Sequence, residues 1–213
     1  DAIADLGFAI SRCRREVARH PARVNLSCSI FVPKPHTAFQ WAPMLPMEEV
    51  VRIREHLRQR TGRSPVSLKF HHVKRSYLEG AMARGDRRVG AVIEAAWRRG
   101  ARFDAWDEHF RFEHWMEAFR EAGVDPEAFT TRAYDVKEPL PWDHIAGAIR
   151  REYLERDKAR YEALASQTLL ATDAEAGEGR AKDVPVRRAP LLEAVAASDN
   201  GDYFSPPTSM VEG

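Results

Sequence analysis

The chain has 213 residues, enough for one domain with a hydrophobic core of ordinary size. Its hydrophobic fraction of 44% and charged fraction of 31% are typical of a globular protein and exclude an intrinsically disordered one. The 33 basic and 32 acidic residues give a net charge of +1, so a nucleic-acid partner has no support from the net charge.

Cys13 and Cys28 are the only cysteines, too few for a disulfide framework or a cysteine metal site. No run of about 18 apolar residues predicts a membrane span, and no charged-then-apolar leader opens the sequence. We therefore expect a cytoplasmic protein without a membrane partner. Asp1 leads directly into a helical pattern, and we expect the chain to be part of a longer polypeptide.

The chain opens with a helix and a strand. Apolar residues at steps of three and four predict a helix over residues 2–19. Alternation of apolar and small polar residues then predicts a strand over residues 24–30. Its small polar face, formed by Asn25, Ser27 and Ser29, is expected to point toward a ligand or the inside of a barrel.

The same order of elements recurs in the next segment. A helix is predicted over residues 47–60 and a strand over residues 66–70. This alternation predicts an α/β fold with parallel strands and covering helices. In that architecture, the loops that follow Ile30 and Phe70 share one face, where ligands bind.

From residue 76 the apolar pattern is helical only. It predicts a short helix over residues 77–83, a second over residues 89–97 and a third over residues 112–119. Asp143 is expected to cap a long helix with a charged surface. The apolar spacing then ends, and residues 169–213 are expected to form a disordered tail.

The eight histidines raise the question of a metal site. His71 and His72 are adjacent on a predicted strand end, so their side chains point to opposite faces. No paired ligand spacing of the kind that zinc requires is present. Histidines at the surface are therefore the favoured interpretation.

A basic turn, residues 84–88, joins two of the predicted helices. The guanidinium groups of Arg84, Arg87 and Arg88 would suit a phosphate or carboxylate clamp. Gly85 and Asp86 would equally suit a turn and a helix cap, and this second interpretation is favoured.

Aromatic residues are dense over one stretch of the helical part. At helical spacing such residues more often form core than a stacking platform. The group comprises Trp97, Phe103, Trp106, Phe110, Phe112 and Trp115. Trp41 and Trp142 lie instead in proline-flanked loops, and we expect them to shape a pocket.

A proline loop, residues 31–41, follows the first strand. Pro33 and Pro35 forbid a helix and stiffen the backbone. A lysine there can neutralise an anion, and an imidazole can move protons near neutral pH. The polar and aromatic candidates in the loop are Lys34, His36, Thr37, Gln40 and Trp41. The alternative is a stiffened turn whose polar groups face water.

The proline loop resembles the signature loop of a family of radical S-adenosylmethionine proteins with an N-terminal cobalamin-binding domain. The residues that carry the resemblance are Phe31-Val32-Pro33-Lys34-Pro35-His36-Thr37, followed by Phe39-Gln40-Trp41. The resemblance covers about residues 20–155. Further blocks that agree with it include Arg84-Gly85-Asp86-Arg87-Arg88, Gly100-Ala101-Arg102-Phe103-Asp104 and Leu140-Pro141-Trp142-Asp143-His144-Ile145. Ala38 stands where the family usually has proline, and the cysteines that usually follow Ile145 are missing.

This resemblance implies a full-length iron-sulfur enzyme in which a C-x-x-x-C-x-x-C motif holds a [4Fe-4S] cluster that reduces S-adenosylmethionine, with cobalamin as a further implied cofactor. The chain lacks that motif, so by itself it is expected to have no radical activity. It would supply the last strands of a partial (β/α) barrel in residues 1–72 and an all-helical extension in residues 73–168. Its partner would be the missing N-terminal part of the same polypeptide, and its substrate is undefined.

The resemblance also assigns roles to residues. The loop residues that would line the substrate end of the barrel are Lys34, His36, Thr37, Gln40 and Trp41. The residues that would form a supporting layer or an anion contact are Glu79, Arg84, Asp86 and Arg87. A competing hypothesis is a non-catalytic interaction module that holds RNA or a protein through the basic turn and the aromatic residues.

Overall fold

The computed structural model of the chain describes residues 1–177. Contacts within the chain define a first compact unit, Asp1–Ala163, and a second that begins at Leu164. The boundary expected between residues 72 and 73 falls inside the first unit. None of the helices in the described part of the chain is both long and apolar enough to cross a membrane.

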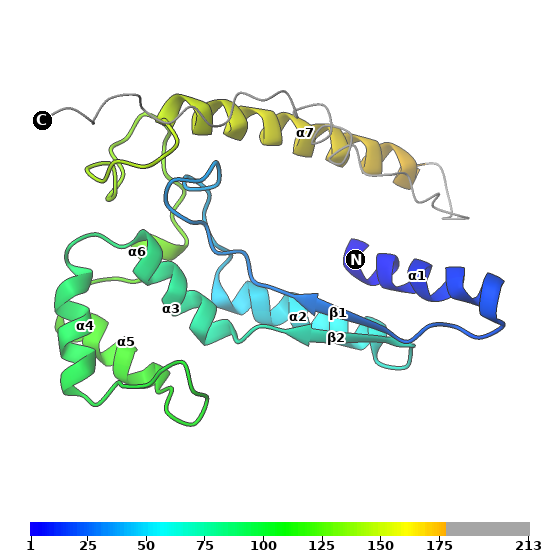
Figure 1. Cartoon of the computed structure of the whole chain (residues 1–213), viewed down its shortest axis with the longest axis horizontal. Coiled ribbons are helices and arrows are strands. Elements are labelled where there is room, and N and C mark those ends of the chain that lie inside the picture. The colour runs from blue at the N-terminus through cyan, green and yellow to red at the C-terminus, as the bar shows by residue number, and fades with distance from the viewer. Residues whose placement is uncertain (178–213) are drawn as a thin grey trace, which may run out of the picture. The chain divides into compact units, whose positions relative to one another are not determined.

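The first unit opens with helix α1 (Ala2–Ala18), strand β1 (Val24–Cys28), helix α2 (Met47–Thr61) and strand β2 (Val66–Phe70) (Figure 1). The two strands pair in parallel, with Val24 opposite Val66 at one end and Cys28 opposite Phe70 at the other. The predicted α/β class with parallel strands is therefore confirmed. Two strands within residues 1–177 do not close a barrel.

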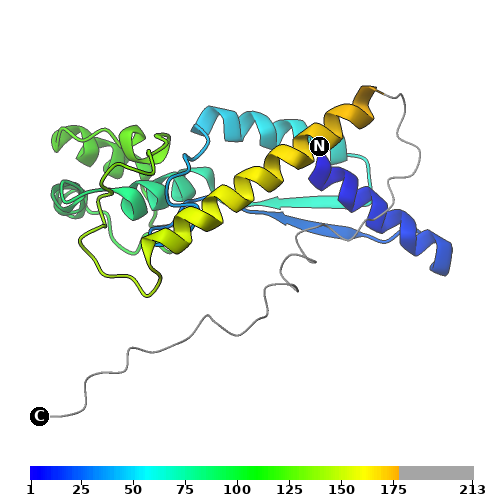
Figure 2. The ribbon, with the colours of Figure 1, turned by 90° about the horizontal axis from the view of Figure 1, so that it is seen from above.

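One face of the strand pair is apolar and lies under two helices. In α1, a Cβ atom added to Gly7 would come within 2.9 Å of side-chain atoms of both Leu26 and Val66, so a glycine lets the helix approach the strands. In α2, the guanidinium of Arg54 stands 5.5 Å from the centre of the Phe70 ring. Figure 2 shows α2 running alongside the strand pair.

The opposite face of the strand pair is polar and exposed. Asn25 and Ser27 in β1 and Ser67 and Lys69 in β2 are all exposed, and they alternate with the covered apolar positions. Asn25 pairs with Ser67 and Ser27 with Lys69, so the four side chains form one patch. Parallel sheets are usually covered on both faces, so this open polar face is unusual.

The remaining elements are helical, as the sequence predicts. They are α3 (Val73–Arg84), α4 (Val89–Arg98), α5 (Phe112–Glu121), α6 (Glu127–Thr130) and α7 (Arg151–Gly177). Helix α6 is not predicted from the sequence because four residues are too few to display a helical period. Helix α3 begins at Val73, ahead of the expected position 77.

The long helix begins at Arg151, so the expectation that Asp143 caps it is wrong. The carboxylate of Asp143 instead accepts hydrogen bonds from the backbone N–H of Leu140 (2.8 Å) and from Nη1 of Arg151 (2.6 Å). These bonds hold a turn ahead of the helix. At its other end α7 extends to Gly177, past the start of the expected tail at residue 169, and residues 178–213 of that tail lie outside the described residues.

Two hydrophobic cores stabilise the first unit. The larger joins α3, α4, α5 and α6, and its most buried side chains include Val92 and Phe119. The smaller core consists of Trp41, Tyr134, Leu140, Trp142 and Leu154. It joins the proline loop to the segment that precedes α7 and to α7 itself.

The expected exposure of the aromatic residues is wrong for Trp41 and Trp142 and for half of the dense group, since Phe110 and Trp115 do pack against the larger core. Trp41 and Trp142, expected to shape a pocket, are 1% and 5% exposed and form core. Phe103 and Trp106, expected to form core, are 71% and 62% exposed. They lie in the segment between α4 and α5, where no helix turns them inward. Phe112 of the same group is buried, as expected.

Candidate functional site

The loops that follow β1 and β2 begin at the same end of the strand pair, because the two strands are parallel. The backbone N–H of His71 donates to the carbonyl of Cys28 (3.2 Å), which extends the pairing by one step beyond the strands. The Ser29 hydroxyl lies 3.4 Å from Nε2 of His71. The prediction that the loops after the two strands share one face is therefore confirmed.

The proline loop is a tight turn held by its own polar groups. The Thr37 hydroxyl donates to the carbonyl of Lys34 (2.8 Å), and the backbone N–H of Gln40 donates to the carbonyl of Thr37 (3.1 Å). His36 has a φ of 57°, in the left-handed region that a non-glycine residue rarely adopts. Thr37 is thus part of the turn, and its expected substrate contact stays a prediction.

Gln40 closes the loop from within. Its side chain is 3% exposed, and Oε1 accepts hydrogen bonds from the backbone N–H of His36 (3.1 Å) and from Nε1 of Trp142 (2.7 Å). The His36 ring packs against Gly147, where an added Cβ would lie 2.8 Å from Nδ1. The segment around Trp142 and Gly147 therefore fixes the conformation of the proline loop.

Trp41 lies beside Gln40 in the smaller core. Its backbone carbonyl accepts a hydrogen bond from the N–H of Tyr134 (2.9 Å), and the guanidinium of Arg151 stands 5.8 Å from the ring centre. The indole Nε1 is buried and has no hydrogen-bond partner among the described residues. Most buried donors are paired, so this N–H is an unused donor under the loop. A substrate contact by Gln40 or Trp41 requires the loop to move and stays a prediction.

Lys34 is the loop residue best placed at the surface. Its ammonium forms an ion pair with the carboxylate of Glu79 in α3, and both side chains are about half exposed, at 46% and 54%. The structure thus brings Lys34 together with a residue that the sequence assigned to a supporting layer. The pair presents one cation and one carboxylate to solvent beside the loop.

The basic turn divides into a buried and an exposed part. Arg84 is 0% exposed, and its guanidinium donates to the carbonyls of Thr130 and Arg132, both at 2.7 Å. It also stands 4.6 Å from the centre of the Tyr134 ring. Burial lowers the pKa of the Arg84 guanidinium. Both donating nitrogens of Arg84 thus already bind backbone carbonyls. The predicted anion contact by Arg84 would require other donors and stays a prediction.

The rest of the basic turn forms a local ion pair. The Asp86 carboxylate accepts from the backbone N–H of Arg88 (2.9 Å) and pairs with its guanidinium (2.8 Å). The side-chain hydrogen bond from Arg88 lowers the pKa of Asp86. The turn part of the favoured interpretation is confirmed, but the expected cap by Asp86 is wrong, because α4 begins at Val89 with Arg88 at its N-cap position and no side-chain cap bond. Arg87 is exposed, so the competing hypothesis of RNA or protein binding rests on Arg87 and Arg88.

Arg151 is a residue that the sequence analysis missed. One nitrogen donates to Asp143, another pairs with Glu155 (3.0 Å), and a third donates to the carbonyls of Val136 and Glu138, the latter at 3.1 Å. The side chain therefore ties the start of α7 to the segment before it. No local sequence signal marks this role, because its partners are backbone groups and carboxylates at several separations.

The described residues do not fit an iron-sulfur cluster. Within residues 1–177 no group of three or more histidine, cysteine or acidic side chains is arranged to hold a metal ion. Cys13 is exposed in α1, and Cys28 lies at the end of β1, where burial raises the pKa of its thiol.

Comparison of the chain with protein-family models, with curated proteins and with solved structures found no match.

Proposed function

We propose that the chain is the C-terminal part of a radical S-adenosylmethionine enzyme and supplies the substrate end of its barrel. The observation that carries this proposal is the strand pair: two parallel strands with an apolar face under α1 and α2 and an open polar face. In a (β/α) barrel the helices lie outside and the other face lines the interior. Further strands of the same polypeptide would complete the barrel.

The site proposed for the substrate lies where β1 and β2 end. In barrel enzymes the loops after the strands carry the catalytic and binding groups. Here those loops hold Lys34, which pairs with Glu79 of α3, together with the His36 imidazole and the Ser29–His71 contact. Lys34 would bind an anionic group of the substrate, because its ammonium lies at the surface and is already oriented by Glu79.

The buried part of the loop has a different role in this proposal. Gln40, with its two accepted hydrogen bonds, holds the proline loop in one conformation. Trp41 carries an unpaired buried N–H, and a substrate or a conformational change that reached it would satisfy that donor. The [4Fe-4S] cluster would supply the reducing electron to S-adenosylmethionine, and its ligands belong to the N-terminal part.

Analysis of the full-length polypeptide tests this proposal. Its sequence ahead of Asp1 should contain a C-x-x-x-C-x-x-C motif, and the protein purified without oxygen should hold iron and sulfide in the ratio of a [4Fe-4S] cluster. Reduction should then release 5′-deoxyadenosine from S-adenosylmethionine. A matched variant with the three cysteines changed to alanine should lose both the iron and this product.

A variant in this chain separates the two parts of the proposal. Lys34→Ala should keep the full iron content, because no group of three or more histidine, cysteine or acidic side chains among the described residues is arranged to hold a metal ion. A full-length polypeptide without the three-cysteine motif, or without iron after anaerobic reconstitution, would refute the enzyme assignment.

A further inference from the structure

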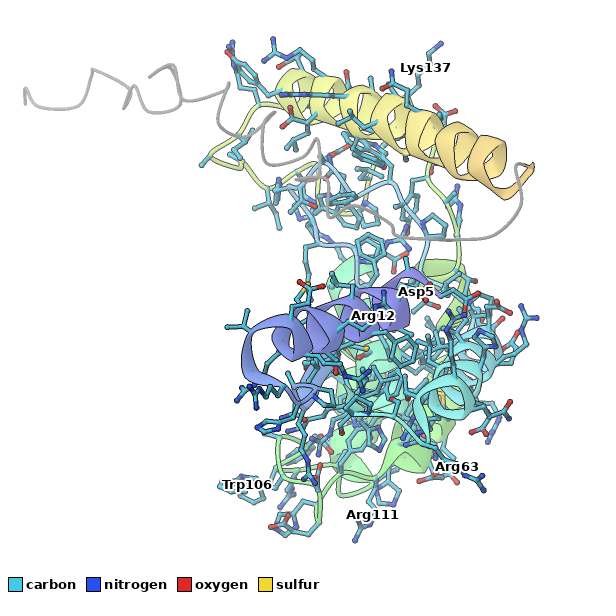
Figure 3. All side chains as sticks on the ribbon, turned by 90° about the vertical axis from the view of Figure 1, so that its right-hand side faces the viewer. Asp5, Arg12, Arg63, Trp106, Arg111 and Lys137 are labelled. Carbon is cyan, nitrogen blue, oxygen red and sulfur yellow. The ribbon has the colours of Figure 1, made fainter. Side chains whose placement is uncertain are left out.

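Three large aromatic side chains are exposed close together along the chain, around the segment between α4 and α5. Trp97, in the last turn of α4, is 55% exposed, Phe103 is 71% exposed and Trp106 is 62% exposed. Figure 3 shows the Trp106 side chain projecting outward. Clustered exposed aromatic groups mark binding surfaces more often than isolated ones do.

The segment forms a hollow with a specific chemical lining. The hollow has a volume of about 350 Å³ and is lined by Phe103, Trp106, Glu108 and His109. The rings of Phe103 and His109 lie 5.9 Å apart, inclined by 54° to each other. The residues of the lining thus carry three aromatic rings and one carboxylate.

Local hydrogen bonds preform this hollow. The backbone N–H groups of Trp106 and Phe110 donate to the carbonyls of Phe103 (2.9 Å) and Trp106 (3.1 Å), which makes two successive turns. An ion pair between Asp107 and Arg75 (2.8 Å) fastens the turns to α3. A preformed site loses little conformational entropy when a ligand binds.

The backbone at Phe103 is strained. Its φ of 58° places a bulky side chain in the left-handed region, which costs about 1–3 kcal/mol. Such strain persists where the surrounding structure imposes it and is concentrated at binding and catalytic sites. The conformation holds the Phe103 ring at the edge of the hollow instead of in the core.

The charge of the lining suits a cation. Aromatic faces attract cations, and the Glu108 carboxylate has no ion-pair partner among the described residues. The nearby cations are engaged: Arg75 pairs with Asp107, and Arg111 donates to the backbone carbonyl of Glu108 (2.8 Å). On the neighbouring surface, the guanidinium of Arg102 already stands 5.2 Å from the centre of the Trp97 ring.

We propose that the hollow lined by Phe103, Trp106, Glu108 and His109 binds an organic cation, either a guanidinium or an alkylated ammonium group. The aromatic rings contact the cation and the Glu108 carboxylate neutralises it. The group belongs to a small molecule or to a side chain of a protein partner. This inference is independent of the proposed enzyme function, since it uses no residue of the proline loop.

Calorimetric titration of the chain with choline and with its neutral isostere 3,3-dimethyl-1-butanol tests the proposal. Choline should bind about fivefold or more tightly than the isostere, because only the cation gains from the rings and the carboxylate. Trp106→Ala and Glu108→Gln should each weaken choline binding by about threefold to tenfold. Trp97→Ala removes an exposed indole outside the hollow and is the matched control, which should bind as the parent does.

Both Trp106 and Glu108 are exposed, so their variants should keep the circular dichroism of the parent. Titration with N-acetylarginine amide and with a peptide containing one arginine identifies the source of the cation: tighter binding of the peptide indicates a protein partner, and equal binding indicates a small molecule. Equal affinity for choline and its neutral isostere, or unchanged binding in a folded Trp106→Ala variant, would overturn the proposal.

Discussion

Replacement of Arg84 by methionine should destabilise the first unit strongly. The substitution keeps a long, flexible side chain but removes the guanidinium that donates to the carbonyls of Thr130 and Arg132. The Thr130 carbonyl is buried and would keep its hydrogen bond from the backbone N–H of Met44 (2.8 Å), but it would lose this second donor without gaining water. The contact with the Tyr134 ring would be lost as well.

The expected cost follows from these contacts. A hydrogen bond from a charged donor contributes about 1.5–3 kcal/mol, and the substitution removes two such bonds. Removal of a buried charge recovers part of its desolvation cost, since no carboxylate pairs with Arg84 among the described residues. We expect a net loss of about 2–4 kcal/mol and a fall in Tm of about 4–16 °C.

Thermal and urea unfolding, followed by circular dichroism, measure this loss. Arg84→Lys should lie between the parent and Arg84→Met, because an ammonium keeps the charge but cannot donate to two carbonyls as the planar guanidinium does. Arg87→Met, at an exposed position of the same turn, is the matched control and should change stability by about 0.5 kcal/mol or less. If Arg84→Met is as stable as the parent, the two carbonyl contacts do not stabilise the fold and the reasoning fails.

Three further predictions concern the loop and the pH dependence. Gln40→Leu should cost about 2–4 kcal/mol in urea unfolding, because the buried Nε1 of Trp142 and the partly buried N–H of His36 lose their acceptor; an unchanged midpoint would contradict this. A double-mutant cycle at Lys34 and Glu79 should give a coupling of only about 0.2–1 kcal/mol that falls with added salt, since both side chains are about half exposed; a salt-independent coupling would contradict it. Burial raises the pKa of Tyr77 to about 12, so the folded form binds the phenolic proton more tightly than the unfolded form does. The free energy of unfolding should therefore fall as the pH rises from 10 toward 12. In alkaline denaturation, Tyr77→Phe should remove the part of this fall that Tyr77 causes.

The periodic elements of the fold were predictable from the sequence. Alternation over β1 and β2 and the three- and four-residue steps of α1, α2, α4 and α5 depend on local pattern, and the structure confirms them. The start of α7 was not predictable from its apolar stripe. Ile145 and Ile149 continue that stripe but are 55% and 53% exposed, because Asp143 binds Leu140 and Arg151 in a turn instead of capping a helix.

The candidate site was predictable only in part. The polar content of the proline loop marked it, and the structure places Lys34 beside Glu79. The burial of Gln40 and Arg84 was not predictable, because their partners lie far away in sequence and are partly backbone groups that carry no sequence signal. The exposure of Phe103 and Trp106 was not predictable either, because it depends on the conformation of a loop, and the spacing of aromatic residues does not indicate that conformation.

The hydrogen bond between Trp142 and Gln40 joins residues 102 positions apart. During synthesis on the ribosome, the proline loop emerges long before the indole that fixes it. The loop therefore lacks this hydrogen bond until Trp142 has been synthesised, although the bond from the Thr37 hydroxyl to Lys34 and the bond from the Gln40 N–H to Thr37 can already form. A polypeptide truncated ahead of Trp142 would keep the bonds within the loop but leave Oε1 of Gln40 without its indole donor.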